Sequence, residues 1–120
     1  LLEESERWIY NFYSKISHLI KDYIQAIIEN NEFNKFENLF HVGIELKKED
    51  LTSIMKNSEL NIKEFLLTFI QSKTDEWIIN YLGYSTLNKI RDYKETKLNS
   101  LKKKIEKKII KKIMKKVFNY

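Results

Sequence analysis

The chain has 120 residues, of which 42% are hydrophobic and 13% aromatic, a content that argues against disorder and is sufficient for one domain with its own core. With two glycines and no proline it has few turn formers for a fold of many strands, and without cysteine it has neither disulfides nor thiolate metal sites. The net charge of +5 is concentrated at the C-terminus: residues 101–120 carry nine lysines and one acid (+8), so the preceding hundred residues carry −3.

The first predicted helix starts at Ser5 or earlier and ends at Asn30-Asn31, because asparagine is second only to glycine in the left-handed conformation that ends a helix. Its apolar residues recur at spacings of three and four, the period of one helix face. The apolar residues of the first helix are Ile9, Phe12, Tyr13, Ile16, Leu19, Ile20, Tyr23, Ala26 and Ile27.

A short second helix is expected over residues 33–40 and stops around Gly43.

Two further helices are predicted in the middle of the chain. Residues 47–55 can form the first of them, with Leu51, Ile54 and Met55 directed inward. Asn61 followed by Glu64 resembles a capping box, in which two side chains satisfy free backbone N–H groups at the start of a helix. The second helix is expected to continue through Ile70.

The last third of the chain begins with Thr74, which predicts the N-cap of a helix that ends at Gly83. Ser85 is expected to cap the next helix, which runs into the tail. An unbroken helix over residues 86–118 would be about 50 Å long at 1.5 Å per residue, which exceeds the width of a small domain. We therefore expect a break or bend near residues 99–100.

These elements predict an all-α fold, a compact bundle of five or six helices that ends in a long basic amphipathic helix. We assign residues 1–100 to the helical bundle and residues 101–120 to a lysine-rich C-terminal helix of the same single domain. No apolar run approaches the roughly 18 residues that a membrane-spanning helix needs. The chain starts at Leu1 without a methionine, which suggests a fragment of a longer protein, and we favour an intracellular location.

The predicted C-terminal helix is amphipathic. At about 100° per residue, its apolar residues, among them Ile105, Ile109 and Ile113, fall on one half of the helix and most of its lysines on the other. Lys108 and Lys112 occupy positions that a strict seven-residue seam would need to be apolar, so a coiled coil is not predicted. The lysines are Lys102, Lys103, Lys104, Lys107, Lys108, Lys111, Lys112, Lys115 and Lys116.

Three kinds of partner fit these lysines. They can neutralise the phosphates of nucleic acid in a salt-dependent, largely sequence-independent way. The helix can also lie on an anionic membrane or enter the groove of an acidic protein, and exposed Ile109, Ile113 and Phe118 would favour these two partners. Free Tyr84 and Tyr93 would instead favour stacking on nucleotides. In a competing structural interpretation, the lysines are a solvated face and the apolar side closes the bundle.

A second candidate segment is residues 74–93, in which a helix, a glycine turn and a second helix superficially resemble a helix-turn-helix. The match is weak, because Lys89 stands where the motif needs an apolar residue, and a plain corner of two helices is the better interpretation. Trp77 and Tyr81 lie one turn apart and fit a buried face. The segment also interleaves aromatic and basic residues, and it contributes four secondary candidate contacts: Lys89, Arg91, Tyr84 and Tyr93.

Motifs that would support catalysis are absent from the sequence, which has no phosphate-binding glycine loop, no Glu-x-x-His pair and no HExxH. We therefore expect neither an enzyme nor a cofactor or metal. Our interpretation is a non-enzymatic helical module that binds DNA or RNA largely through phosphates, as an accessory domain of a larger replication, repair or RNA-processing protein. The alternative is a protein-interaction module whose basic helix docks on an acidic protein partner or an anionic membrane surface.

Overall fold

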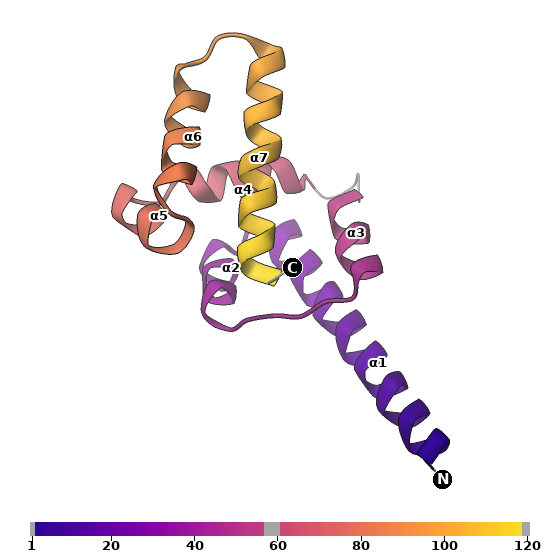
Figure 1. Ribbon diagram of the computed structural model, residues 1–120. Coiled ribbons are helices and arrows are strands. Elements are labelled where there is room, and N and C mark those ends of the chain that lie inside the picture. The colour runs from indigo at the N-terminus through magenta and orange to yellow at the C-terminus, as the bar shows by residue number, and fades with distance from the viewer. Residues whose placement is uncertain (1, 57–60, 119–120) are drawn as a thin grey trace.

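The computed structural model describes residues 2–56 and 61–118, and within these ranges it contains seven α-helices, one short 3₁₀ helix and no strand (Figure 1). The all-α prediction is confirmed, with more helices than the five or six that we expected. The elements are α1 (Leu2–Glu29), α2 (Phe33–Asn38), the 3₁₀ helix η1 (Leu39–His41), α3 (Lys48–Lys56), α4 (Ile62–Gln71), α5 (Asp75–Leu82), α6 (Tyr84–Glu95) and α7 (Asn99–Phe118).

Local signals account for several helix ends. Asn31 adopts a left-handed φ of 52° just after α1, as predicted. The hydroxyl of Thr74 accepts a hydrogen bond from the backbone N–H of Trp77 at 3.1 Å and caps α5. The predicted capping box at α4 is wrong, because Asn61 donates its side-chain amide to the carboxylate of Glu64 and makes no capping bond to the backbone.

A single residue, Gly83, joins α5 to α6. Its φ of 87° and ψ of 166° lie in a region that is essentially restricted to glycine, and its N–H bonds to the carbonyls of Ile78 and Ile79 at 3.0 and 3.1 Å. Ser85 lies inside α6 and does not cap it, contrary to our prediction. Since a helix-turn-helix has a turn of three or four residues, this junction is a plain corner of two helices.

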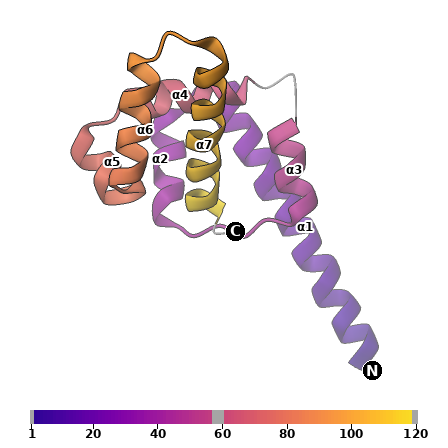
Figure 2. The same cartoon turned by 45° about the horizontal axis from the view of Figure 1, so that its top comes forward.

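The last helix, α7, lies against the centre of the body, with α4 behind it and α6 beside it (Figures 1 and 2). The helix breaks as predicted, but at residues 96–98, slightly before the predicted residues 99–100, which begin α7, and the helices α6 and α7 pack together. Each fully buried apolar side chain contributes roughly 1.5–3 kcal/mol, so α7 is a principal source of core stability. Its apolar side chains at most 2% exposed are Ile109, Ile113, Met114, Val117 and Phe118.

The N-terminal half of α1 projects from this body, as both views show (Figures 1 and 2). The C-terminal half is anchored by Ile24 and Ile27, both 0% exposed, and by the hydroxyl of Ser17, which donates a hydrogen bond to Asp50 at 2.6 Å. The molecule measures 61 × 29 × 23 Å, with a radius of gyration of 16.5 Å. A compact chain of this length would have about 14 Å, so the protein is longer than the compact bundle that we predicted.

Candidate nucleic-acid interface

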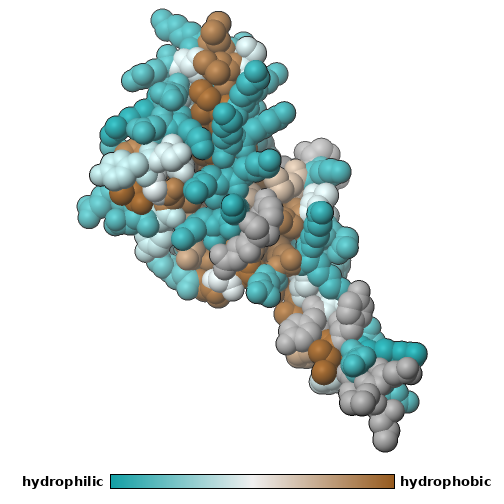
Figure 3. Space-filling model, in the orientation of Figure 1, coloured by the Kyte–Doolittle hydropathy of each residue, from teal (hydrophilic) through white to brown (hydrophobic). Residues whose placement is uncertain are grey.

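The lysines of α7 lie around the parts of the helix that the core leaves uncovered. Lys102 is half-buried, and the other eight tail lysines are exposed. Figure 3 shows hydrophilic side chains gathered along α7 on the face that it presents to solvent. Because the apolar side of the same helix is buried from Ile109 onward, lysines make up most of the exposed surface of this part of α7.

Five lysines from two helices line one shallow groove, which we call the lysine groove. Its volume is about 430 Å³, and all of its lining residues are lysines. Side chains on α6 and α7 therefore come together from positions about 20 residues apart in the chain. The lysine groove consists of Lys89 on α6 and Lys108, Lys111, Lys112 and Lys115 on α7.

The lysines of the groove form no ion pair with any residue that the structure describes, although Asp92 and Glu95 line an adjoining hollow together with Lys89 and Lys108. Within residues 2–56 and 61–118, none of the nine tail lysines lies within 4.0 Å of a carboxylate oxygen. The ion pairs of the described chain use other bases, such as Lys73 with Glu37 at 2.8 Å. A cluster of like charges that form no ion pairs attracts ions of opposite charge and raises their local concentration.

The one acid of α7, Glu106, is buried and not part of this basic surface. The residue is 8% exposed; one carboxylate oxygen is in an ion pair with Lys63 of α4, and the other accepts a hydrogen bond from the hydroxyl of Tyr93 of α6 at 3.0 Å. Burial alone would raise the pKa of Glu106, but the hydrogen bonds from Lys63 and Tyr93 and the charges of Lys63 and Lys102 outweigh it, so the pKa is below 4.5. Glu106 thus links three helices as an ionised group.

Glu106 is the principal residue that our sequence analysis overlooked. A signal for it was present, because Glu106 precedes Ile109 by three residues and Ile113 by seven, which places the acid on the apolar side of the helix. A single carboxylate on an apolar helix face needs a buried partner. Those partners, Lys63 and Tyr93, come from other helices and could not be identified from spacing.

The secondary candidates on α6 do not form one site. Lys89 joins the lysine groove, whereas Arg91 donates a hydrogen bond to Asp75 at 3.2 Å. Two residues along a helix are about 200° apart, so Arg91 lies on another side of α6 from Lys89. Tyr84 is 68% exposed and, seven residues before Arg91, lies on the side of Arg91.

Tyr93 is not free to stack on a nucleotide. Its hydroxyl is bonded to Glu106, and the ammonium nitrogen of Lys102 lies 5.2 Å from the centre of its ring. Burial, followed by the hydrogen bond to Glu106 and the charge of that carboxylate, raises the pKa of Tyr93 above 10.0. The ring is therefore part of the packing between α6 and α7.

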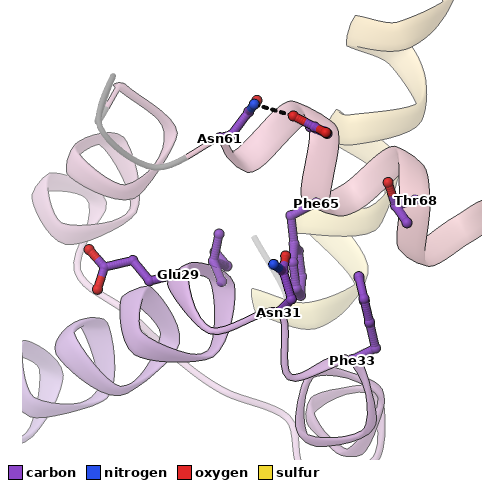
Figure 4. Close-up of a pocket in the computed structure, with 8 residues that line it drawn as sticks. Glu29, Asn31, Phe33, Asn61, Phe65 and Thr68 are labelled. Carbon is purple, nitrogen blue, oxygen red and sulfur yellow. Dashed lines mark hydrogen bonds between the residues drawn. The ribbon is translucent and has the colours of Figure 1, made fainter.

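A second hollow has a different chemistry (Figure 4). It has a volume of about 510 Å³ and lies where the end of α1 meets α2 and α4, beside the stacked rings of Phe33 and Phe65, whose centres are 4.9 Å apart. Two of its lining residues, Glu29 and Glu64, are acids, and none is a base. This hollow would repel an anion.

Comparison with known protein families, with curated proteins and with solved structures finds no match. Any function must therefore be argued from the side chains themselves. In the described part of the chain, no helix has the length and apolar character needed to cross a membrane. Nor do three histidine, aspartate or glutamate side chains there converge as the ligands of a metal ion would.

Proposed function

We propose that this chain is a non-enzymatic helical module that binds DNA or RNA through phosphates, and that the lysine groove is its binding surface. The observation that carries this proposal is the convergence of five lysines, without a carboxylate partner, on one groove between α6 and α7. From Lys108 to Lys115 the groove follows α7 for about 10 Å. Duplex DNA presents about six negative charges over that length, so the spacing suits a polyphosphate backbone.

The burial of the apolar side of α7 supports phosphate binding over the other partners. A helix that lies in a membrane interface, or in the groove of an acidic protein, uses a free apolar side in addition to its charges. Ile109, Ile113 and Phe118 are 1%, 0% and 2% exposed, so the apolar side of α7 is covered from Ile109 onward, and on this helix Leu101, near its N-terminal end, is 44% exposed. The role that we propose is that of an accessory domain in a larger replication, repair or RNA-processing protein.

The residues around the lysine groove also bear on whether it should prefer single-stranded or double-stranded nucleic acid. Stacking on unpaired bases needs free aromatic side chains next to the basic groove. Tyr93 is engaged by Glu106, and exposed Tyr84 lies on a different side of α6 from Lys89. We therefore propose recognition through phosphates alone, without a stacking contribution to single-strand binding.

Fluorescence anisotropy of labelled single- and double-stranded oligonucleotides at several salt concentrations tests the proposal. If all five groove lysines neutralise phosphates, the slope of log K against log salt should be about −4.5 for duplex DNA and about −3.5 for a single strand. Absence of binding at ~50 mM salt, where electrostatic contacts are strongest, would overturn the proposal.

Two triple variants with the same net charge distinguish the groove from general basicity. The groove variant should reduce the magnitude of the duplex slope by about 3, whereas the control variant should change it by less than 1. Equal losses would show that net charge, and not the groove, determines binding. The groove variant is K108Q/K111Q/K115Q, and the control, at exposed positions outside the groove, is K103Q/K107Q/K116Q.

A further inference from the structure

The projecting helix α1 carries an apolar face that is largely exposed to solvent. Five of the residues that our sequence analysis assigned to the apolar side of this helix are between 36% and 67% exposed. Their successive spacings are three, four, three and four residues. We call this face the α1 seam; it consists of Ile9, Phe12, Ile16, Leu19 and Tyr23.

The spacing of the α1 seam is that of a coiled coil. A strict seven-residue repeat places Ile9 and Ile16 at one core position and Phe12 and Leu19 at the other. In parallel coiled coils, isoleucine at the first of these positions with leucine at the second favours two strands, and Ile16 with Leu19 has this combination, whereas Phe12 departs from it. In α7, lysines interrupt this seven-residue repeat, so α1 has the pattern of a coiled coil and α7 does not.

The face through which α1 joins the body adjoins the seam and lies nearer the C-terminal end of the helix. That face is made by Ile24, Ile27 and Ile28, all at most 4% exposed, together with Ser17. The seam thus leaves the core intact and remains available along the arm, where Figure 3 shows apolar surface. The rings of Trp8 and Phe12 stack with centres 5.5 Å apart and extend the seam toward the N-terminus.

The exposed area is sufficient for a dimer. At roughly 200 Å² for a large apolar side chain, the exposed fractions of Trp8 and the seam residues amount to on the order of 600 Å². The largest apolar patch on a typical monomer is about 300–600 Å². Two copies would bury about 1,200 Å² from these side chains alone, and stable interfaces bury about 1,200–2,000 Å² in total.

The charges near the seam favour a second copy over an anionic partner. Residues 2–16 carry three acids and two bases, a balance that does not attract a lipid surface or a nucleic acid. Lys15 and Asp22 flank the seam at equivalent positions of the repeat, and their charges cancel. Pairing of identical seams therefore brings together two apolar faces without a net charge at their flanks.

We propose that two copies of this chain associate through the α1 seam, forming a two-stranded coiled coil outside the helical bodies. This association leaves the lysine grooves of both copies free. Because its driving force is apolar burial, it should persist at high salt, unlike binding to phosphates.

Sedimentation equilibrium of the full 120-residue chain, over a range from about 1 μM to about 1 mM, tests the dimer. The average mass should rise from 14.6 kDa toward twice that value, at low and at high salt. Leu19→Glu places a charge in the seam and should weaken association at least about 10-fold. A mass that stays at 14.6 kDa throughout would overturn the proposal.

Asn11→Glu is the matched control, because it adds the same charge at an exposed position of α1 outside the seam. It should leave the association constant within about twofold of the original. An equal loss in the Asn11 and Leu19 variants would also overturn the proposal. Phe12→Glu, further from the body, repeats the seam test at a second position, and circular dichroism verifies that each variant retains its helices.

Discussion

The helix α7 and the N-terminal half of α1 both carry apolar residues three or four positions apart. In α7 the core covers most of these residues, whereas in the first half of α1 they are exposed to solvent. Ile113 of α7 is 0% exposed, whereas Leu19 of α1 is 67% exposed. The chain reverses at Gly83 and again at residues 96–98, so α7 returns across the body and packs against α4, α5, α6 and η1. The first half of α1 extends beyond its neighbours α2 and α3. Periodicity identifies a helix and its apolar side, but the path of the chain decides what covers that side.

The largest expected effect comes from deleting apolar volume in the covered helix. Ile113→Ala should lower the free energy of unfolding by about 2–5 kcal/mol, because it leaves a cavity in the core. Leu19→Ala, measured at concentrations where the chain is monomeric, should change it by at most about 0.5 kcal/mol. Urea unfolding followed by circular dichroism measures both values. Similar losses would contradict the contrast between the two helices.

A smaller effect is expected from the buried acid of α7. Glu106→Gln removes the ionised partner of Lys63 and Tyr93 and should lower the free energy of unfolding at pH 7 by about 1.5–3 kcal/mol. Glu95→Gln, at an exposed position of α6, is the control and should cost less than about 0.5 kcal/mol. If the two variants are equally stable, the carboxylate of Glu106 does not hold α7 in place.

The same cluster predicts a pH dependence. The pKa of Glu106 is lower in the folded than in the unfolded chain, so its stabilisation is present above about pH 5 and is lost as the pH falls through the folded pKa. The Glu106→Gln variant should therefore lose less stability than the original chain on acidification. The pKa of Tyr93 is raised, so its contribution is lost as the pH rises above about 10, and Tyr93→Phe should remove that loss. Thermal unfolding as a function of pH measures both the acid and the alkaline loss of stability.

The corner between α5 and α6 should be sensitive to the addition of a side chain at Gly83. Gly83→Ala should lower the free energy of unfolding by about 1–3 kcal/mol, because alanine rarely adopts the backbone angles of this position. Apart from the adjacent residues, no heavy atom lies within 4 Å of the added methyl group, so the cost comes from the backbone conformation. Denaturant unfolding measures it, and an unchanged midpoint would show that the corner relaxes without loss of packing.

The smallest effect is expected on the solvent face of α7. Lys108 and Lys112 are exposed like charges four residues apart, so replacing both with glutamine should stabilise the helix by about 0.2–0.5 kcal/mol. The same double variant should weaken oligonucleotide binding. A marked destabilisation, seen by thermal unfolding, would mean that these lysines serve the fold and not a partner.

Much of the secondary structure was accessible from the sequence. Periodicity and turn residues predicted the existence of the helices, the left-handed Asn31, the cap at Thr74 and the break before α7. The exposure of the α1 seam was not predicted, because periodicity contains no information about neighbouring elements. The strict alternation of three and four residues from Ile9 to Tyr23 was nevertheless a visible difference from α7.

The candidate site was harder to predict from the sequence than the secondary structure. The tail lysines could be recognised as one face, but their union with Lys89 depends on the antiparallel packing of α6 and α7. The same packing engages Tyr93 and separates Arg91 and Tyr84 from the groove. Contacts of this kind are set by the geometry of a helical hairpin and have no counterpart in local spacing.

The buried carboxylate of α7 also decides which way the positive surface points. In much of this helix two lysines alternate with two apolar residues, so a modest turn about its axis would bring Ile110 to the position of Ile109 and still bury an apolar row. Apolar burial alone distinguishes these rotational settings poorly. Only one setting places Glu106 between Lys63 and Tyr93, and that setting directs Lys108, Lys111, Lys112 and Lys115 toward Lys89. We infer that the single negative charge of Glu106 selects the rotation of α7 about its own axis.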